Sequence, residues 1–165
     1  MAVIMLHIGQ RLVTAYIDGA EYDRAIARHV EHILVQPLLP FALRRLADST
    51  GIEIWTNTGL YAARNHEYLP DYVQTETPDQ LAARWVAEHR NGVHGMKPRF
   101  IKIGANRGPL GAIDKKIVKA AALCTKETGL TIASHTGNGI AAMEQIAIVT
   151  ETKVPAAKFV WVHAD

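Results

Sequence analysis

The sequence predicts an α/β protein in which parallel strands alternate with helices, and two observations support this. From about residue 41 onward, strand-like and helix-like segments alternate with a repeat of about 30 residues, which is the length of a βαβ unit. The strand-like segments at residues 99–105, 130–134 and 159–163 are apolar on both faces. Such strands are typical of a parallel sheet that is covered by helices.

The chain divides into two parts by how regular this alternation is. Residues 1–40 follow it poorly, although 2–8 (AVIMLHI) have the composition of a strand and 22–35 that of a helix. No low-complexity linker separates the two parts. We therefore predict a leader over residues 1–40 and a regular α/β part over residues 41–165.

The first elements of the regular part are a helix that ends at Gly51 and a strand over residues 52–57. A helix is next predicted to begin after Thr77, which is expected to be its N-cap. Pro78 then occupies the first helical position, and Gln80 completes a capping box. These residues make this the best-defined helix start in the sequence.

The second half of the regular part repeats the same pattern. A strand over residues 99–105 leads through a glycine-containing turn to a helix with Asp114 as its predicted cap and Gly129 as its end. One face of this helix carries the apolar stripe Ile117, Ala121, Cys124 and Thr128. The remaining predicted elements are a strand over 130–134, a turn over 135–139, a helix over 140–152 and a final strand over 159–165.

Composition excludes several classes of protein. The 165 residues carry a net charge of +2, and the basic residues are scattered, so nucleic-acid binding has weak support. No apolar run approaches the roughly 20 residues of a membrane span, and the start lacks the basic region of a signal peptide. The single cysteine, Cys124, fits a reducing compartment. We therefore expect a cytoplasmic protein without a membrane or nucleic-acid partner.

Three chemically unusual residues fall on successive strands. Side chains alternate across a strand, and this alternation assigns Lys102, His135 and His163 to the face opposite the aliphatic β-branched residues. Each lies towards the carboxyl end of its strand, where parallel α/β folds build their sites. Their coincidence on one face predicts a functional site.

The structural alternatives are ordinary. A histidine at a strand end is commonly a hydrogen-bonded structural residue, and a lysine in a strand commonly extends to water at a sheet edge. A buried lysine with a lowered pKa is instead a nucleophile. It can form a Schiff base with a carbonyl substrate, or it can take up carbon dioxide and become a carbamate. Only the carbamate could bind a metal, because an ammonium group has donors alone.

Five segments stand in this order along the chain: LRRLADSTGIEIWTNTGLY, TPDQLAARWVAEHRNGVHG, RFIKIGANRGPL, TGLTIASHTGNG and FVWVHAD. Together they resemble the phosphotriesterase family of the amidohydrolase superfamily. The resemblance covers roughly residues 43–165 and implies a partial (β/α)₈ TIM barrel that contains strands three to six. The family's His-x-His pair of strand one has no counterpart in residues 1–40. The sequence ends at Asp165, just after the segment that matches strand six, so the strand-eight aspartate of the family has no counterpart in it either.

The resemblance also implies a chemistry. It implies a hydrolytic site for divalent metal, with zinc expected, in which a carboxylated Lys102 bridges two metal ions and acts as the catalytic lysine. His135 and His163 would bind one of these ions, and Tyr61 would line the substrate pocket. The implied substrate is a small phosphoester, phosphotriester, carboxylic ester or lactone, although part of the metal site is missing. The alternatives are an inactive truncated relative that forms homo-oligomers through exposed strand edges, and a Schiff-base lyase that uses Lys102.

Overall fold

A computed structural model of the chain describes residues 2–8, 11–17, 45, 48–49, 51, 55–93, 95–162 and 164. At the N-terminus, strands β1 (Ala2–Ile8) and β2 (Arg11–Ile17) pair antiparallel. The predicted strand over 2–8 is therefore present, whereas its partner β2 was not predicted. The predicted helix over 22–35 lies outside the described residues.

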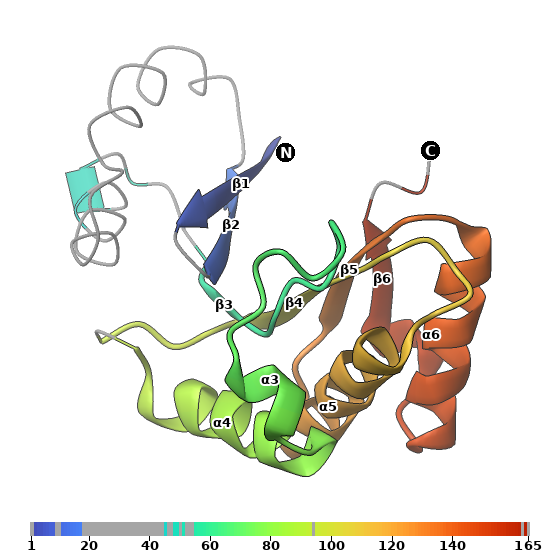
Figure 1. The fold of residues 1–165 in the computed structure, drawn as a ribbon. Helices are drawn as coiled ribbons and strands as arrows, with labels where there is room; N and C mark the ends of the chain where they lie inside the picture. Colours follow the sequence, from blue (N-terminus) through green and yellow to red (C-terminus); the bar gives the residue numbers. More distant parts are fainter. Residues whose placement is uncertain are drawn as a thin grey trace.

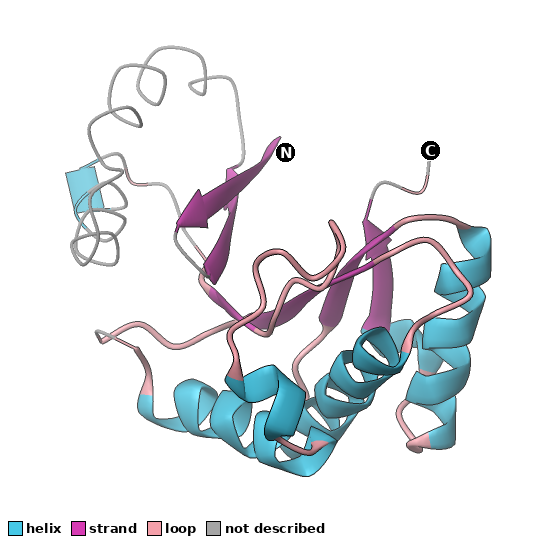
Figure 2. Cartoon of the chain, viewed as in Figure 1, coloured by secondary structure: helices cyan, strands magenta, loops and turns pink. Residues whose placement is uncertain are grey.

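The regular part is built around a four-stranded parallel sheet (Figures 1 and 2). The strand order is β3-β4-β5-β6, with every neighbouring pair parallel. Helices connect successive strands, and Figure 1 shows α5 and α6 lying along the same side of the sheet. The predicted α/β class is confirmed. The strands are β3 (Asn57–Thr58), β4 (Phe100–Ala105), β5 (Ile132–Thr136) and β6 (Phe159–Val162). The helices with described bounds are α3 (Tyr72–Thr75), α4 (Pro78–Asn91), α5 (Ala112–Thr128), α6 (Gly139–Glu151) and the 3₁₀ turn η2 (Ala156–Lys158), and residues 45, 48 and 49 are also helical.

The start of α4 confirms the predicted capping box. The Gln80 amide donates to Thr77 Oγ1 over 3.2 Å, and the Thr77 amide donates to Gln80 Oε1 over 2.8 Å. Gly92 caps the other end, as Gly129 does for α5 with φ +75°. These short-range signals are reliable because each satisfies backbone groups that the helix itself leaves without a partner.

The start of α5 differs from the prediction. The helix begins at Ala112 with Gly111 as its cap, so Asp114 is a first-turn residue and not the N-cap. The Asp114 carboxylate instead accepts from the Asn106 backbone amide over 3.0 Å. Asp114 therefore bonds to the loop between β4 and α5 and does not cap the helix as the sequence predicts.

Strand β5 lies later in the sequence than predicted. It runs over Ile132–Thr136 and not over residues 130–134, so His135 is inside the strand and not in the following turn. The turn is short, and Asn138 caps α6 by accepting from the Ala141 amide over 3.0 Å. Parallel pairing with β4 extends the strand, since Gly104 and Ala105 pair with His135 and Thr136.

The main hydrophobic core lies between the sheet and the helices. Ile101 and Ile103 of β4 are fully buried there, and Ile132 of β5 lies beside them. From α5, Ile117 and Ala121 pack into the same cluster. This core covers one face of the sheet, and Lys102, which alternates with Ile101 and Ile103 along β4, points to the other face.

Candidate active site

Lys102 lies in the middle of the sheet. Its strand, β4, has β3 on one side and β5 on the other, and the Lys102 residue is only 2% exposed. The interpretation that the lysine extends to water from an exposed sheet edge is therefore wrong. The Lys102 Nζ donates to the Ile103 carbonyl over 3.3 Å and lies 5.8 Å from the centre of the Tyr61 ring. Among the described residues, no carboxylate forms an ion pair with it.

Burial changes the acid–base behaviour of this lysine. Removal of water from the ammonium group lowers the pKa of Lys102 from 10.5 to about 8. At pH 7, roughly one molecule in ten then carries the neutral amine. A neutral amine has a lone pair and can attack an electrophilic carbon, which the ammonium form cannot do.

His135 shares the face of Lys102. In a parallel sheet, paired residues point to the same side, and the pairs Lys102–Ala133 and Gly104–His135 place the two side chains on one face, two residues apart along the strands. The His135 ring lies 5.6 Å from the Tyr61 ring, with the ring planes inclined at 46°. Tyr61 therefore lies near both Lys102 and His135.

Tyr61 comes from the loop that follows β3. Its backbone pairs with Gly104, and its ring occupies the space that a side chain at residue 104 would need. Burial raises the pKa of the Tyr61 hydroxyl above its ordinary value, although the Arg64 guanidinium acts in the opposite direction. The neutral phenol is thus the stable form at neutral pH.

Strand β6 corrects one part of the predicted arrangement. Phe159 pairs with Ile132 and packs on the main core, while Trp161 pairs with Ser134 and would lie 3.9 Å from a Cβ at Gly139 of α6. Phe159 and Trp161 therefore face the helices and not Lys102. Strand alternation put Phe159 and Trp161 on the Lys102 face together with His163, and for Phe159 and Trp161 this is wrong. His163 itself lies outside the described residues, so its predicted place stays a prediction.

The described residues do not by themselves furnish a metal site. Within the part of the chain that the structure describes, no group of three or more His, Cys, Asp or Glu side chains could hold a metal ion. His135 is a conventional ligand, whereas Lys102 would become one only as a carbamate. Catalytic zinc sites generally use three protein ligands, so this chemistry is incomplete in the described region.

A buried polar network behind β5 was not predicted. Gln145 of α6 is fully buried, and its Oε1 accepts from Ser134 Oγ over 2.6 Å. Its Nε2 donates to Thr136 Oγ1 over 2.9 Å. Ser134 and Thr136 flank His135, so the network fixes the strand segment that carries the histidine. The signal in the sequence is a glutamine on the otherwise apolar inner face of α6.

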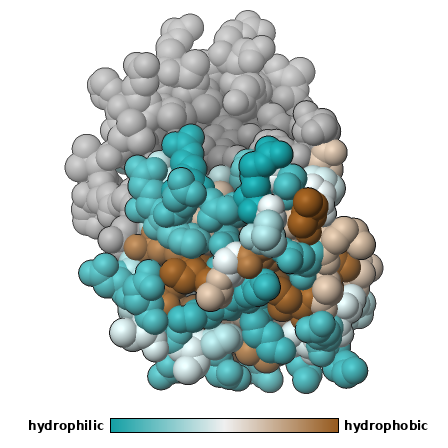
Figure 3. Space-filling model, turned by 45° about the vertical axis from the view of Figure 1, so that its right-hand side comes forward, coloured by the Kyte–Doolittle hydropathy of each residue, from teal (hydrophilic) through white to brown (hydrophobic). Residues whose placement is uncertain are grey.

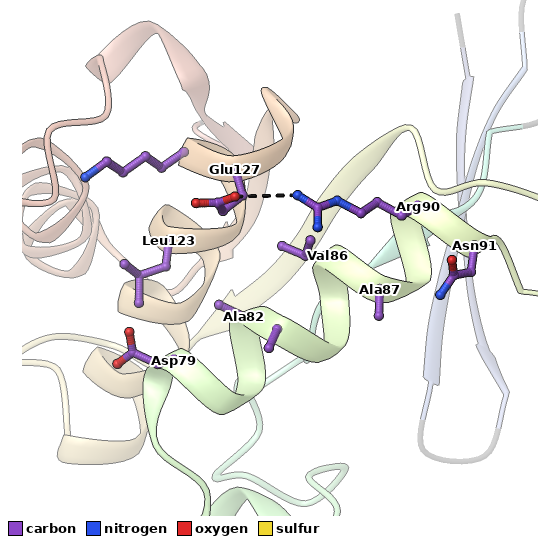
Figure 4. Close-up of a pocket in the computed structure, with 10 residues that line it drawn as sticks. Asp79, Ala82, Val86, Ala87, Arg90, Asn91, Leu123 and Glu127 are labelled. Atoms are coloured by element: carbon purple, nitrogen blue, oxygen red, sulfur yellow. Dashed lines mark ion pairs between the residues drawn. The ribbon is translucent and has the colours of Figure 1, made fainter.

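The surface has other features away from this site. Figure 3 shows a mainly hydrophilic described surface with separate apolar patches, and Ile140, Met143 and Val160 are among the exposed large apolar residues. A hollow of about 550 Å³ lies between α4 and α5, where Arg90 approaches Glu127 at 3.5 Å (Figure 4). It belongs to the helix layer, on the other side of the sheet from Lys102. No described helix is long and apolar enough to cross a membrane.

Comparisons with known proteins identify relatives of this chain. The phosphotriesterase homology protein of Escherichia coli K12 is 29% identical over 119 residues, which are 70% of this chain and 40% of that protein. The aryldialkylphosphatase of Saccharolobus solfataricus is 28% identical over 124 residues, which are 73% and 38% of the two chains. This chain thus spans about two fifths of the length of these relatives.

A solved structure matches at the level of the fold. The crystal structure of the Escherichia coli phosphotriesterase homology protein, complexed with phosphate in its active site, superposes with a TM-score of 0.68 at 28% identity. The match covers 74% of this chain and 42% of that one. The sequence profile of the phosphotriesterase family matches residues 37–165, which is most of the chain. The chain therefore belongs to the phosphotriesterase family.

Proposed function

We propose that this chain provides the strand-three-to-six part of a metal-dependent hydrolase that acts on phosphoester, carboxylic ester or lactone bonds. The observation that carries the proposal is the buried Lys102 on the sheet face that also holds His135. Lys102 has no ion pair among the described residues, and a buried charge of this kind destabilises a fold, so its presence at the centre of the sheet favours a chemical role. The phosphoester class is favoured by the names of the relatives, one an aryldialkylphosphatase and one solved with phosphate in its active site.

Lys102 would act after reaction with carbon dioxide. The neutral amine attacks the carbon, an N–C bond forms, one C=O electron pair moves to oxygen, and the nitrogen loses a proton to solvent. The product is a carbamate, which carries the oxygen ligands that divalent metals such as zinc accept. His135 would be a second ligand and His163 a third, and for His163 the support is the family resemblance. Tyr61 would form the wall against which the substrate lies.

The proposal is tested by measuring the carbamate of Lys102 and the metal ion that it would bind. The full chain is prepared with zinc and ¹³C-bicarbonate, and its metal content and its carbamate ¹³C resonance are measured. We expect one metal ion per chain, a resonance that disappears in Lys102→Gln, and little or no hydrolysis. Lys115→Gln, which changes an exposed lysine of α5, is the matched control and should keep both signals. Absence of metal and of a carbamate under all conditions would refute the proposal.

A non-catalytic role has one observation in its favour. The outer side of β6 pairs with no strand among the described residues, and apolar side chains lie nearby: Val160 is 46% exposed, and Ile140 and Met143 of α6 are 59% and 67% exposed. Such an edge can pair with another chain of the same kind. Sedimentation velocity distinguishes this role, because a monomer at high concentration would speak against it.

The Schiff-base alternative has its own experiment. Borohydride reduction in the presence of a carbonyl substrate would trap an adduct on Lys102 if the residue forms a Schiff base. We expect no adduct, because carbamate formation and Schiff-base formation compete for the same amine. In either role we propose a cytoplasmic location, for which the single buried Cys124 is the supporting observation.

A further inference from the structure

The loop between β3 and α3 holds Tyr61 against β4 by backbone contacts. The Ala62 amide donates to the Gly104 carbonyl over 2.9 Å, next to the point where Tyr61 pairs with Gly104. A Cβ at Gly104 would lie 2.5 Å from two atoms of the Tyr61 ring. The ring therefore lies directly on the strand that carries Lys102, and its position depends on where the loop is held.

The loop adopts a backbone conformation that side chains disfavour. Arg64, Asn65 and His66 have φ values of +58°, +53° and +68°, which place three successive non-glycine residues in the left-handed region. Such conformations persist only where surrounding contacts impose them. The loop therefore needs anchors outside its own chain segment.

Asn106 provides the first anchor. Its Nδ2 donates to the Ala62 carbonyl over 3.0 Å, and its Oδ1 accepts from the Asn65 amide over 2.9 Å. The Nδ2 also donates to Asp114 Oδ1 over 3.2 Å. One amide group thus bonds to the start and to the middle of the strained turn, and every one of its donors is used.

Asp114 provides the second anchor. It is 2% exposed, and its Oδ1 accepts from both the backbone and the side chain of Asn106. The other oxygen, Oδ2, lies 3.1 Å from His66 Nε2. Because a carboxylate only accepts, this nitrogen carries the proton and donates. Both oxygens of the carboxylate therefore have hydrogen-bond partners, Oδ1 in the loop that follows β4 and Oδ2 in the turn over residues 64–66.

We propose that Asn106 and Asp114 are positioning residues that clamp the β3–α3 loop to the β4–α5 unit and thereby hold the Tyr61 ring over Lys102 and His135. Neither residue needs to touch a substrate. Since Lys102, Asn106 and Asp114 belong to one β4–α5 unit, the clamp fixes the height of Tyr61 relative to the lysine. The catalytic consequence rests on the proposed function, whereas the clamp itself does not.

Amide hydrogen exchange on the full chain tests the clamp without substrate or metal. In Asn106→Ala, the amides of Ala62 and His66 should exchange at least about tenfold faster, because the turn loses its side-chain anchor. The core amide of Ile103 should keep its rate. Lys119→Met is the matched control, because it removes a comparable 3.0 Å bond to Thr152 on the other side of α5 and should leave the loop amides unchanged.

A conservative variant of Asp114 separates the loss of its hydrogen bonds from the loss of side-chain volume. Asp114→Asn keeps an oxygen for Asn106 and should hold the Ala62 rate within about threefold of the parent, whereas Asp114→Ala should behave like Asn106→Ala. Should Asn106→Ala fail to fold, Asn106→Ser replaces it, with the same expectation. Unchanged exchange at Ala62, or an equal rise at Ala62 and Ile103, would overturn the proposal.

Activity provides a separate measurement. Wherever hydrolysis is detected, Asn106→Ala should raise KM more than it lowers kcat, since a displaced Tyr61 weakens substrate positioning. The exchange result stands whether or not the chain hydrolyses esters. Failure of the clamp and failure of the proposed hydrolase are therefore distinguishable.

Discussion

Replacement of Gly104 by alanine should destabilise the protein through one specific neighbour, Tyr61. The three atoms closest to the new methyl group all belong to the Tyr61 ring, two of them at 2.5 Å. Ordinary van der Waals contact begins near 3.4 Å, so the ring has to move by about 1 Å or the strand has to shift. Both elements are held by hydrogen bonds, and neither can move without loss.

The expected magnitude follows from overpacking. Extra methylene groups in a packed region cost about 1–3 kcal/mol. For a chain of this size, a loss of 2 kcal/mol lowers Tm by about 4–8 °C. In a Tyr61→Ala background the clash disappears, and Gly104→Ala should then stabilise by roughly 0.5–1 kcal/mol, because glycine in a strand is entropically unfavourable. The substitution therefore changes sign between the two backgrounds.

A double-mutant cycle measured by urea unfolding reports this coupling. Gly129→Ala is the control, since its φ of +75° makes alanine unfavourable while no atom lies within 4 Å of the new Cβ. Its cost should be the same with and without Tyr61. Equal costs of Gly104→Ala in both backgrounds would show that the Tyr61 ring does not occupy this position, and the reasoning on the site would fail.

Three further predictions concern buried groups. The pKa of Lys102 in the folded chain lies below its unfolded value, so unfolding takes up a proton and the free energy of unfolding should rise between about pH 8 and pH 10.5. In bicarbonate-free buffer, Lys102→Met should therefore raise the free energy of unfolding by about 3 kcal/mol at pH 7. This difference should disappear by pH 10.5, as measured by urea titrations. No difference in this pH dependence between parent and variant would contradict the assignment. Gln145→Leu removes the short Gln145 bonds of Ser134 and Thr136 and leaves these hydroxyls only bonds of 3.3–3.4 Å to each other and to strand carbonyls, so thermal unfolding should reveal a total loss of about 1–3 kcal/mol. A loss no larger than that of an exposed-residue variant would argue against the network. Burial raises the pKa of Cys124 to about 11, so a thiol reagent should modify it only as the protein unfolds, and rapid labelling of the native protein would be incompatible with the fold.

Local signals in the sequence determined the class of fold and several helix boundaries. The capping box around Thr77 and the glycine at residue 129 satisfy backbone groups of their own helix, and nothing distant has to be known. The assignment of Lys102 and His135 to one face also follows from strand alternation, provided that the two strands pair in the register observed.

The tertiary structure decided what local signals leave open. Asp114 could have capped its own helix, and only the approach of Asn106 shows that the loop takes the carboxylate instead. The face of Phe159 depends on its pairing with Ile132, because a shift of one residue exchanges the two faces of a strand. Alternation within a strand fixes which residues share a face, but the register with the neighbouring strand fixes which face points to the core.

Tyr61 shows the same difference, for the candidate site, between what the sequence determines and what the tertiary structure determines. The sequence supplies a tyrosine in a loop, and the family resemblance suggests a role in substrate binding. Its position over Lys102 results from a glycine at residue 104 and from anchors at residues 106 and 114, more than 40 positions further along the chain. Contacts over such separations are set by packing and not by local propensity, so they become visible only when the strands and loops are in place.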